Sequence, residues 1–330
     1  MTATSPRKVL SLVGAGRSGS TILSSILSEV PGVFGAGELR WLWARDLPQQ
    51  RLCGCGAAPS SCPVWGPTVE RALSVPPARQ SGPEAAALLR EVAEAQQHVG
   101  GWSQRRRLLT SPDAGRDLDP EATRVTRATV SVLDALFEVT GAHTIIDASK
   151  RPQEAALLAA SGAFDHFVVH MVRDPRAVVY SWRRVKPLPA ETGRAAMGTR
   201  SQRRTLMRWV ENAAGAELLR RHVPADRWLF MRYEDFAAEP RDAVRRVLDL
   251  LGEPADPPFT GDDTVLLGPN HNLSGNPNRF TTGQVRIVPD HEWTRQLSRR
   301  DQAMIEATTL PFLLRYGYPV LPRRTDAAAR

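Results

Sequence analysis

The sequence contains no apolar run that approaches the length of a membrane span, although it is 330 residues long. The residues before Lys8 also lack the apolar core that a signal peptide carries. We therefore expect a cytoplasmic protein without a membrane span. Hydrophobic residues make up 42 % of the chain and charged residues 24 %, which is ordinary for a globular protein that is large enough to bury a core.

Cysteine is scarce, and the three that occur are Cys53, Cys55 and Cys62. This small odd number argues against a disulfide framework. A closed zinc site needs four ligands, and the sequence shows no fourth cysteine or nearby histidine, so we assign no metal ligand. A local disulfide or plain packing is the favoured interpretation, and a cytoplasmic location favours free thiols.

Lysine is scarce as well, because only Lys8, Lys150 and Lys186 stand among the 43 basic residues. The net charge is nevertheless +8. A positive charge favours binding to nucleic acid, to an anionic surface or to an anionic ligand. The arginine doublets and the triplet are scattered, are not interleaved with aromatic residues, and can reflect codon composition. We expect no nucleic-acid partner, and a basic binding module remains an alternative.

Strand-like and helix-like segments alternate along the chain. Strands are expected at 9–13, 144–146, 167–172 and 228–231, and helices at 20–29, 152–161, 175–184, 200–221, 241–251 and 298–316. This alternation predicts one α/β domain with a parallel sheet that helices cover on both faces. Residues 67–140 are expected to form a helical insertion with breaks at 76–77 and 111–113, residues 252–289 a long loop, and residues 319–330 a frayed tail.

The segment Gly14–Gly19 fits the pattern G-x-G-x-x-G between a strand and a helix. An NAD(P)-dependent oxidoreductase of the Rossmann type needs an acidic residue after a second strand, about 20 residues on. Glu38 has that spacing, but residues 31–37 make a poor strand, so this function is the less favoured alternative. The loop also lacks the lysine of Gly-Lys-Ser/Thr, which disfavours an ATP or GTP hydrolase and a kinase.

The loop instead carries one cation and several hydroxyls at the start of a helix. These are Arg17, Ser18, Ser20 and Thr21. Amides at a helix N-terminus and the helix dipole favour an anion, and an arginine fork can bind two oxygens of a phosphate or sulfonate. The loop is therefore predicted to bind such a group.

The stretch Val172–Ser181 resembles the 3′-phosphate motif of sulfotransferases that use 3′-phosphoadenosine 5′-phosphosulfate (PAPS). The resemblance implies that Arg173 and Ser181 bind the 3′-phosphate of the donor. The segment Gly16–Thr21 is similar to the family's 5′-phosphosulfate loop, in the arginine version of Golgi and bacterial members. Arg17, Ser18, Gly19, Ser20 and Thr21 are then expected to bind the donor, whose product is the bisphosphate PAP.

Other segments between residues 9 and 280 are similar to the family too, whereas 67–104 matches nothing we can place. Arg232–Asp235 looks like its Tyr-Glu-Asp segment, which implies that Tyr233 lies near the nucleotide. Residues 270–280 resemble a late loop of bacterial members, which implies that the loop closes over the donor with Arg279 as its cation. The cysteine stretch has a look common in bacterial members. The resemblance implies a three-layer α/β fold whose parallel sheet is like that of P-loop NTPases.

The resemblance also implies a catalytic set. Glu38 follows a glycine, as the base of similar members does, and we expect burial near Trp41 and Trp43 to raise its pKa. Cytosolic animal members use a histidine as the base where this chain has Asp147–Lys150, and the absence of that histidine favours Glu38. In related enzymes a lysine at the place of Lys150 contacts the transferring sulfuryl group, and Arg17 is expected to share that task. His271 is the second candidate for the base, and the transfer requires no metal.

The acceptor is not readable from the sequence. A hydroxyl of a small molecule, a carbohydrate or a lipid fits equally well. The region 67–140 is expected to cover the acceptor pocket, with Trp41, Trp43 and Trp182 as its apolar wall. The oligomeric state is not predicted.

Overall fold

The computed structural model describes residues 7–73, 83–110, 118–188 and 196–320. The predicted breaks at 76–77 and 111–113, and the tail from 321 on, lie outside the described residues. None of the helices in the described part of the chain combines the length and the hydrophobicity that crossing a bilayer requires.

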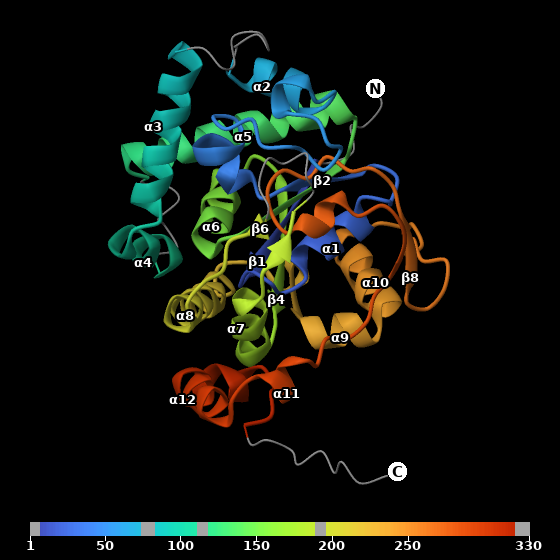
Figure 1. The fold of residues 1–330 in the computed structure, drawn as a ribbon. Coiled ribbons are helices and arrows are strands. Elements are labelled where there is room, and N and C mark those ends of the chain that lie inside the picture. Colours follow the sequence, from blue (N-terminus) through green and yellow to red (C-terminus); the bar gives the residue numbers. More distant parts are fainter. Residues whose placement is uncertain (1–6, 74–82, 111–117, 189–195, 321–330) are drawn as a thin grey trace.

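A five-stranded parallel sheet forms the centre of the molecule (Figure 1). Its strands are β1 (Lys8–Gly14), β2 (Val33–Gly37), β3 (Thr144–Lys150), β4 (Asp165–Val172) and β7 (Trp228–Arg232). They lie in the order β2-β3-β1-β4-β7, and every neighbouring pair is parallel. The predicted α/β class with a parallel sheet is therefore confirmed.

Strand β2 corrects the expectation that residues 31–37 make a poor strand. It pairs with β3 along the edge of the sheet, with Val33 opposite Thr144. Glycine lowers strand propensity, which concealed the strand, but here it also permits close packing. A Cβ atom on Gly35 would lie 2.5 Å from the Ser28 hydroxyl and 2.8 Å from the Asn272 side chain.

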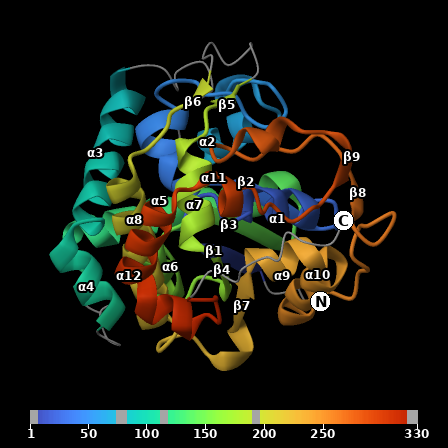
Figure 2. The same cartoon turned by 60° about the horizontal axis from the view of Figure 1, so that its bottom comes forward.

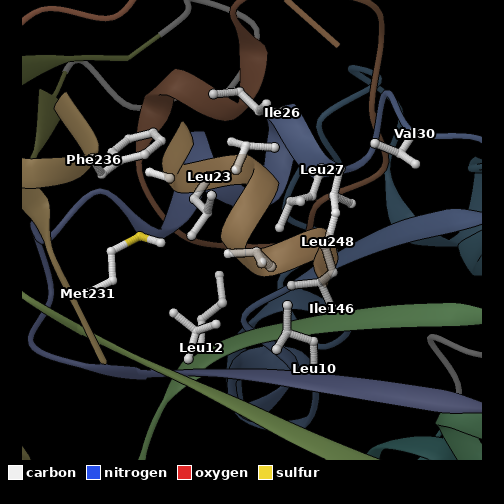
Figure 3. Close-up of a cluster of buried hydrophobic side chains, with 14 of the residues drawn as sticks. Leu10, Leu12, Leu23, Ile26, Leu27, Val30, Ile146, Met231, Phe236 and Leu248 are labelled. Atoms are coloured by element: carbon white, nitrogen blue, oxygen red, sulfur yellow. The ribbon is translucent and has the colours of Figure 1, made fainter. Parts of the chain in front are cut away.

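Helices cover both faces of the sheet (Figure 1). One face carries α1 (Ser20–Leu27), α9 (Tyr233–Ala238) and α10 (Pro240–Leu251), and the other carries α5 (Pro120–Thr140), α6 (Pro152–Ser161) and α8 (Gln202–Leu219). The side chains of β1 alternate between these layers. Leu10 and Leu12 point toward α1 and α10 (Figure 3), whereas Val9 and Val13 pack on the opposite face. Burial of each leucine stabilises the fold by about 1.5–3 kcal/mol.

The remaining helices lie around this three-layer centre (Figure 2). They are α2 (Trp65–Leu73), α3 (Pro83–Val99), α4 (Trp102–Thr110), α7 (Pro175–Arg183), α11 (Trp293–Gln296) and α12 (Arg299–Arg315). Helix α7 begins where the sequence places it, because the Asp174 carboxylate accepts a hydrogen bond of 2.8 Å from the amide of Arg176.

Two short antiparallel pairs complete the described part of the chain. Strands β5 (Lys186–Pro187) and β6 (Ala196–Met197) form one pair, and β8 (Thr264–Leu267) and β9 (Gly283–Arg286) form the other. The expectation of a plain loop over 252–289 is therefore wrong. Fifteen residues separate β8 from β9, so no short turn signal marks this pair in the sequence.

Candidate active site

The ends of the five strands bring the predicted site residues together. Because all strands are parallel, their carboxyl ends meet at one edge of the sheet. The glycine loop follows β1, Glu38 follows β2, Lys150 ends β3, Arg173 follows β4, and Tyr233 follows β7. Residues that are far apart in the sequence thus become neighbours through the topology alone.

A cleft opens at this edge, and its charged lining is almost entirely cationic. The described residues in its wall include six predicted ones: Arg17, Gly19, Ser20, Thr21, Glu38 and Lys150. They also include five arginines that the sequence analysis did not single out: Arg40, Arg45, Arg151, Arg200 and Arg208. Glu38 is the one carboxylate in this described lining. Arginines that look scattered along the chain are therefore gathered by folding into a site that suits an anionic ligand.

The glycine loop has a backbone that only glycine can supply at two of its positions. Gly14 has a φ of 140°, and a Cβ atom there would lie 2.2 Å from the carbonyl oxygen of Met171. Gly19 has a φ of 86°, and a Cβ atom there would lie 2.7 Å from the ring of Tyr233. Arg17 itself has a φ of 74°, which is unusual for a residue with a side chain and is typical of functional sites.

The Arg17 side chain is held in place but keeps free hydrogen-bond donors. Its guanidinium lies 4.6 Å from the centre of the Trp182 ring, and Nη2 donates to the Met197 sulfur at 3.1 Å. Its Nε and Nη1, and the Ser18 hydroxyl, are buried without a hydrogen-bond partner among the described residues. An unpaired buried donor costs about 1–3 kcal/mol, and an anion in the cleft removes this cost. The residues present thus fit a phosphate or sulfonate group.

Arg173 lies directly against the glycine loop and is 6 % exposed. Its Nη1 donates to the carbonyl oxygen of Arg17 at 3.1 Å, and its guanidinium lies 4.2 Å from the centre of the Tyr233 ring. Nη2 pairs with Asp290 at 3.0 Å, while Nε has no partner in the described part of the chain. Ser181 is buried on α7, and it shares no hydrogen bond with Arg173 among the described residues.

Glu38 and Lys150 form an ion pair in the cleft. Lys150 Nζ lies 2.7 Å from Glu38 Oε1, and the two side chains are 11 % and 15 % exposed. The second carboxylate oxygen accepts a hydrogen bond of 2.9 Å from the indole of Trp41. Lys150 has a φ of 68°, and the pairing of β3 shifts in register near this end of the strand, so the backbone is bent where the lysine must turn inward.

The pKa of Glu38 is lowered from its ordinary value. Burial by itself raises this pKa, but the charge and hydrogen bond of Lys150 lower it, as do the charges of Arg40 and Arg45, and together they outweigh burial. The expectation of a raised pKa is therefore wrong, because the sequence did not reveal how many cations face the carboxylate. Glu38 is ionised at neutral pH and can accept a proton.

The late loop, residues 270–280, forms a wall of the cleft. The carbonyl oxygen of Leu273 accepts a hydrogen bond of 2.8 Å from the amide of Glu38, and the amide of Asn276 donates to the Thr21 hydroxyl at 3.3 Å. Arg279 is not among the described residues that line the cleft. It is buried behind the loop and donates to the carbonyl oxygen of Leu52 at 3.4 Å.

His271 points away from the cleft, toward the cysteines. Its Nδ1 lies 3.3 Å from Cys62 Sγ and 3.7 Å from Cys53 Sγ, so the structure does not place this second candidate for the base beside Lys150. All three cysteines are free, so of the interpretations that the sequence left open the structure has free thiols and no local disulfide among them. A nitrogen donor 209 residues after Cys62 thus joins the cysteines, which the sequence could not show.

The predicted acceptor wall is only partly present. Trp41 and Trp182 line the cleft, but Trp43 is 2 % exposed and packs in the hydrophobic core. None of the described residues between 67 and 140 lines the cleft. The role of this region as a cover stays a prediction.

Residues 165–257, which include Arg173, Ser181 and Tyr233, match the sequence profile of the sulfotransferase family. This match confirms the resemblance to the sulfotransferase family. No curated protein matches the chain in sequence.

Two solved sulfotransferase domains share the fold of the chain. The sulfotransferase domain of the olefin synthase from Synechococcus PCC 7002 is 20 % identical with a TM-score of 0.53, and the match covers 98 % of each chain. The sulfotransferase domain from the curacin biosynthetic pathway is 14 % identical with a TM-score of 0.52, and the match covers 96 % of this chain and 99 % of that one.

The strand order also separates this fold from that of dinucleotide-binding enzymes. In the Rossmann fold the second strand lies beside the first, so that its terminal acid reaches the ribose. Here β3 lies between β1 and β2, and Glu38 pairs with Lys150 at the end of that inserted strand. The spacing between the glycine loop and Glu38 therefore does not indicate an NAD(P) site.

Proposed function

We propose that this protein transfers a sulfuryl group from PAPS to a hydroxyl group of a small-molecule, carbohydrate or lipid acceptor. The observation that carries the proposal is the arrangement at the sheet edge. Arg17 presents buried, unpartnered donors in the cleft that also holds the Glu38–Lys150 ion pair, and Arg173, whose Nε is unpartnered among the described residues, lies against the same glycine loop. This arrangement combines sites for two anionic groups with a base and a cation for group transfer.

The donor would lie along the glycine loop. PAPS supplies an activated sulfuryl group on a nucleotide that also carries a 3′-phosphate. Arg17, Ser18 and the amides at the start of α1 suit the 5′ side, because a helix N-terminus favours an anion and because Arg17 Nε, Arg17 Nη1 and the Ser18 hydroxyl are buried without a partner among the described residues. Arg173, joined to that loop through the carbonyl oxygen of Arg17, suits the 3′-phosphate with Ser181. Tyr233 packs between Gly19 and Arg173 and would border the nucleotide.

The chain's own residues would carry the proton and the charge. The ionised Glu38 accepts the proton of the acceptor hydroxyl. The protonated carboxyl group is neutral, so it no longer forms an ion pair with Lys150. Lys150 Nζ is then free to stabilise negative charge on the transferring group, a task that Arg17 shares. Positive side chains thus meet the electrostatic demand of the transfer, and the proposal needs no metal ion in the cleft.

The acceptor hydroxyl would approach Glu38 from the side of the cleft where Trp41 and Trp182 lie. We propose that the region 67–140 covers this side when the acceptor is bound. We also propose a cytoplasmic location, because the three cysteines are free, as is usual in a reducing compartment.

The proposed reaction predicts release of PAP only when a suitable hydroxyl is present. The full chain is incubated with PAPS and, separately, with a phenol, a sugar and a fatty alcohol, and both PAP and the sulfated product are measured by mass spectrometry. We expect equal amounts of PAP and product with one class of acceptor. Failure of PAP to bind, together with the absence of product for all three classes, would contradict the proposal.

Lys150→Met is expected to shift the acid limb of the pH–rate profile to higher pH. Lys150 holds the pKa of Glu38 below its ordinary value, so in the wild type the base stays ionised well into the acid range. Without Lys150, burial is the largest remaining influence and raises the pKa, so activity is lost at a higher pH as the medium is acidified. The rate at neutral pH should also fall by about 10²-fold or more, because a charge-stabilising group is missing.

The measurement is kcat/KM as a function of pH for wild type, Lys150→Met and Lys150→Arg. The arginine variant keeps the positive charge and should keep the low acid limb. An unchanged acid limb in Lys150→Met would show that Glu38 and Lys150 are not coupled in the reaction.

A further inference from the structure

A cluster of three thiols and one imidazole lies behind the late loop, outside the cleft. The donor atoms of Cys53, Cys55, Cys62 and His271 all lie within 4.8 Å of one another. We propose that these four residues form a closed structural zinc site. The site does not depend on the proposed transfer reaction, because none of its four residues lines the cleft in the described part of the chain.

The spacing of the donor atoms matches a tetrahedral shell. Zinc binds thiolate sulfur at about 2.3 Å and imidazole nitrogen at about 2.0 Å, which puts sulfurs about 3.8 Å apart and sulfur about 3.5 Å from nitrogen. The Sγ atom of Cys62 lies 3.8 Å from those of Cys53 and Cys55. His271 Nδ1 lies 3.3 Å and 3.7 Å from two of the sulfurs. The sulfur spacing far exceeds the roughly 2.05 Å of a disulfide bond.

The backbone around the cysteines is shaped to present them as a unit. The amide of Cys53 donates a hydrogen bond of 2.8 Å to the carbonyl oxygen of Ala57. The amide of Gly56 donates one of 2.9 Å to the carbonyl oxygen of Cys53, and together these two bonds close a tight turn. Gly54 lies against the late loop so closely that a Cβ atom would come within 2.2 Å of the Asn270 side chain. The sequence Cys-Gly-Cys therefore lets two thiols approach the histidine from one turn.

Neighbouring residues hold the four side chains in place, as residues around the metal ligands do in known metal sites. The Trp65 amide donates to Cys62 Sγ at 3.5 Å, and the Trp65 indole donates to the carbonyl oxygen of His271 at 2.7 Å. The ring of Phe34 stacks on that of His271 with the ring centres 6.3 Å apart. Cys53 and Cys62 are 0 % and 2 % exposed, so these two thiols are shielded from solvent, whereas Cys55 is half-buried.

The chemistry of the donor set selects zinc. Three thiolates and one imidazole are soft and borderline ligands in a tetrahedral arrangement, which suits zinc and excludes the oxygen-seeking cations. Four protein donors complete the shell and leave no position for a substrate. A structural role follows, in which the ion joins the cysteine segment to the late loop. That loop supports Glu38 through Leu273, so the metal would hold one wall of the cleft.

The test is the metal content and the metal spectrum of the full chain. Protein purified under reducing conditions without a metal-chelating step should contain about one zinc per chain by elemental mass spectrometry. Replacement of the metal by cobalt(II) should give thiolate charge-transfer absorption and the intense visible bands of tetrahedral coordination. Cys62→Ser and His271→Ala should lose most of the zinc. His291→Ala, which changes an exposed histidine on another loop, should keep it.

The cobalt spectrum of the unaltered chain decides the matter even if a cysteine variant fails to fold. A chain that contains no zinc after exposure to it, gives no thiolate band with cobalt and offers all three thiols to a thiol reagent would overturn the proposal. Equal zinc content in wild type and both ligand variants would overturn it as well, because the metal would then be held elsewhere.

Discussion

Glu38→Gln is expected to lower kcat of sulfuryl transfer by about 10²–10⁴-fold, because a general base contributes about that much to a reaction. Glutamine keeps the size of the side chain and can still accept the hydrogen bond from Trp41, but it cannot take up the acceptor's proton. Binding of PAP should be unchanged or tighter, since the variant removes the one carboxylate in the described lining of a cleft for anions. Steady-state rates with the identified acceptor, together with calorimetric titration of PAP, measure the two effects separately.

Glu29→Gln is the matched control for this prediction. The Glu29 carboxylate also accepts a hydrogen bond, of 2.8 Å from the amide of Gly268, but it lies outside the cleft. We expect its rate to stay within about threefold of wild type, since surface and peripheral changes have small effects. A Glu38→Gln enzyme that keeps its rate would show that another group takes the proton.

Arg173→Ala is expected to weaken PAP binding by about 100-fold, or about 2.8 kcal/mol. The variant removes charge-assisted hydrogen bonds to a phosphate, each worth about 1.5–3 kcal/mol. ADP lacks the 3′-phosphate, so its affinity should change by less than about threefold. Calorimetric titration of both nucleotides to wild type and variant measures the difference.

Two further variants isolate the cause of this loss. Arg183→Ala removes an arginine at the end of α7, whose side chain is 41 % exposed, and should leave PAP affinity unchanged. Arg173→Ala also leaves Asp290 without its ion-pair partner and free to repel the ligand. The double variant Arg173→Ala/Asp290→Asn should stay weak. Full recovery in the double variant, or equal losses for PAP and ADP, would contradict a direct role of Arg173 at the 3′-phosphate.

Local patterns predict the regular elements of this fold well. The strand over 167–172 and the helix over 152–161 are continuous in the sequence, and the structure has both. Strand β2 was missed because its glycines are selected for close packing against distant side chains. The β8–β9 pair was missed because its strands are short and far apart.

The residues of the site also divide into those that a local motif marks and those that only folding brings together. Arg17 and Lys150 were recognised because each stands at a strand end beside a motif. Arg200 was not, because it follows no motif, and only the folded chain lays its guanidinium 3.8 Å from the centre of the Trp182 ring. Arg40 and Arg45, which no motif marks either, help Lys150 to lower the pKa of Glu38 against the effect of burial. Non-local neighbours of this kind are what a single sequence leaves out.

The most direct test of the account is thermal unfolding of the wild-type chain with PAP, ATP and NAD in parallel. A ligand at about one hundred times its dissociation constant adds roughly 2.7 kcal/mol to the free energy of unfolding. The arrangement of Arg17 and Arg173 predicts that PAP raises the unfolding temperature and that ATP and NAD at the same concentration do not. Stabilisation by NAD or ATP without stabilisation by PAP would contradict the account.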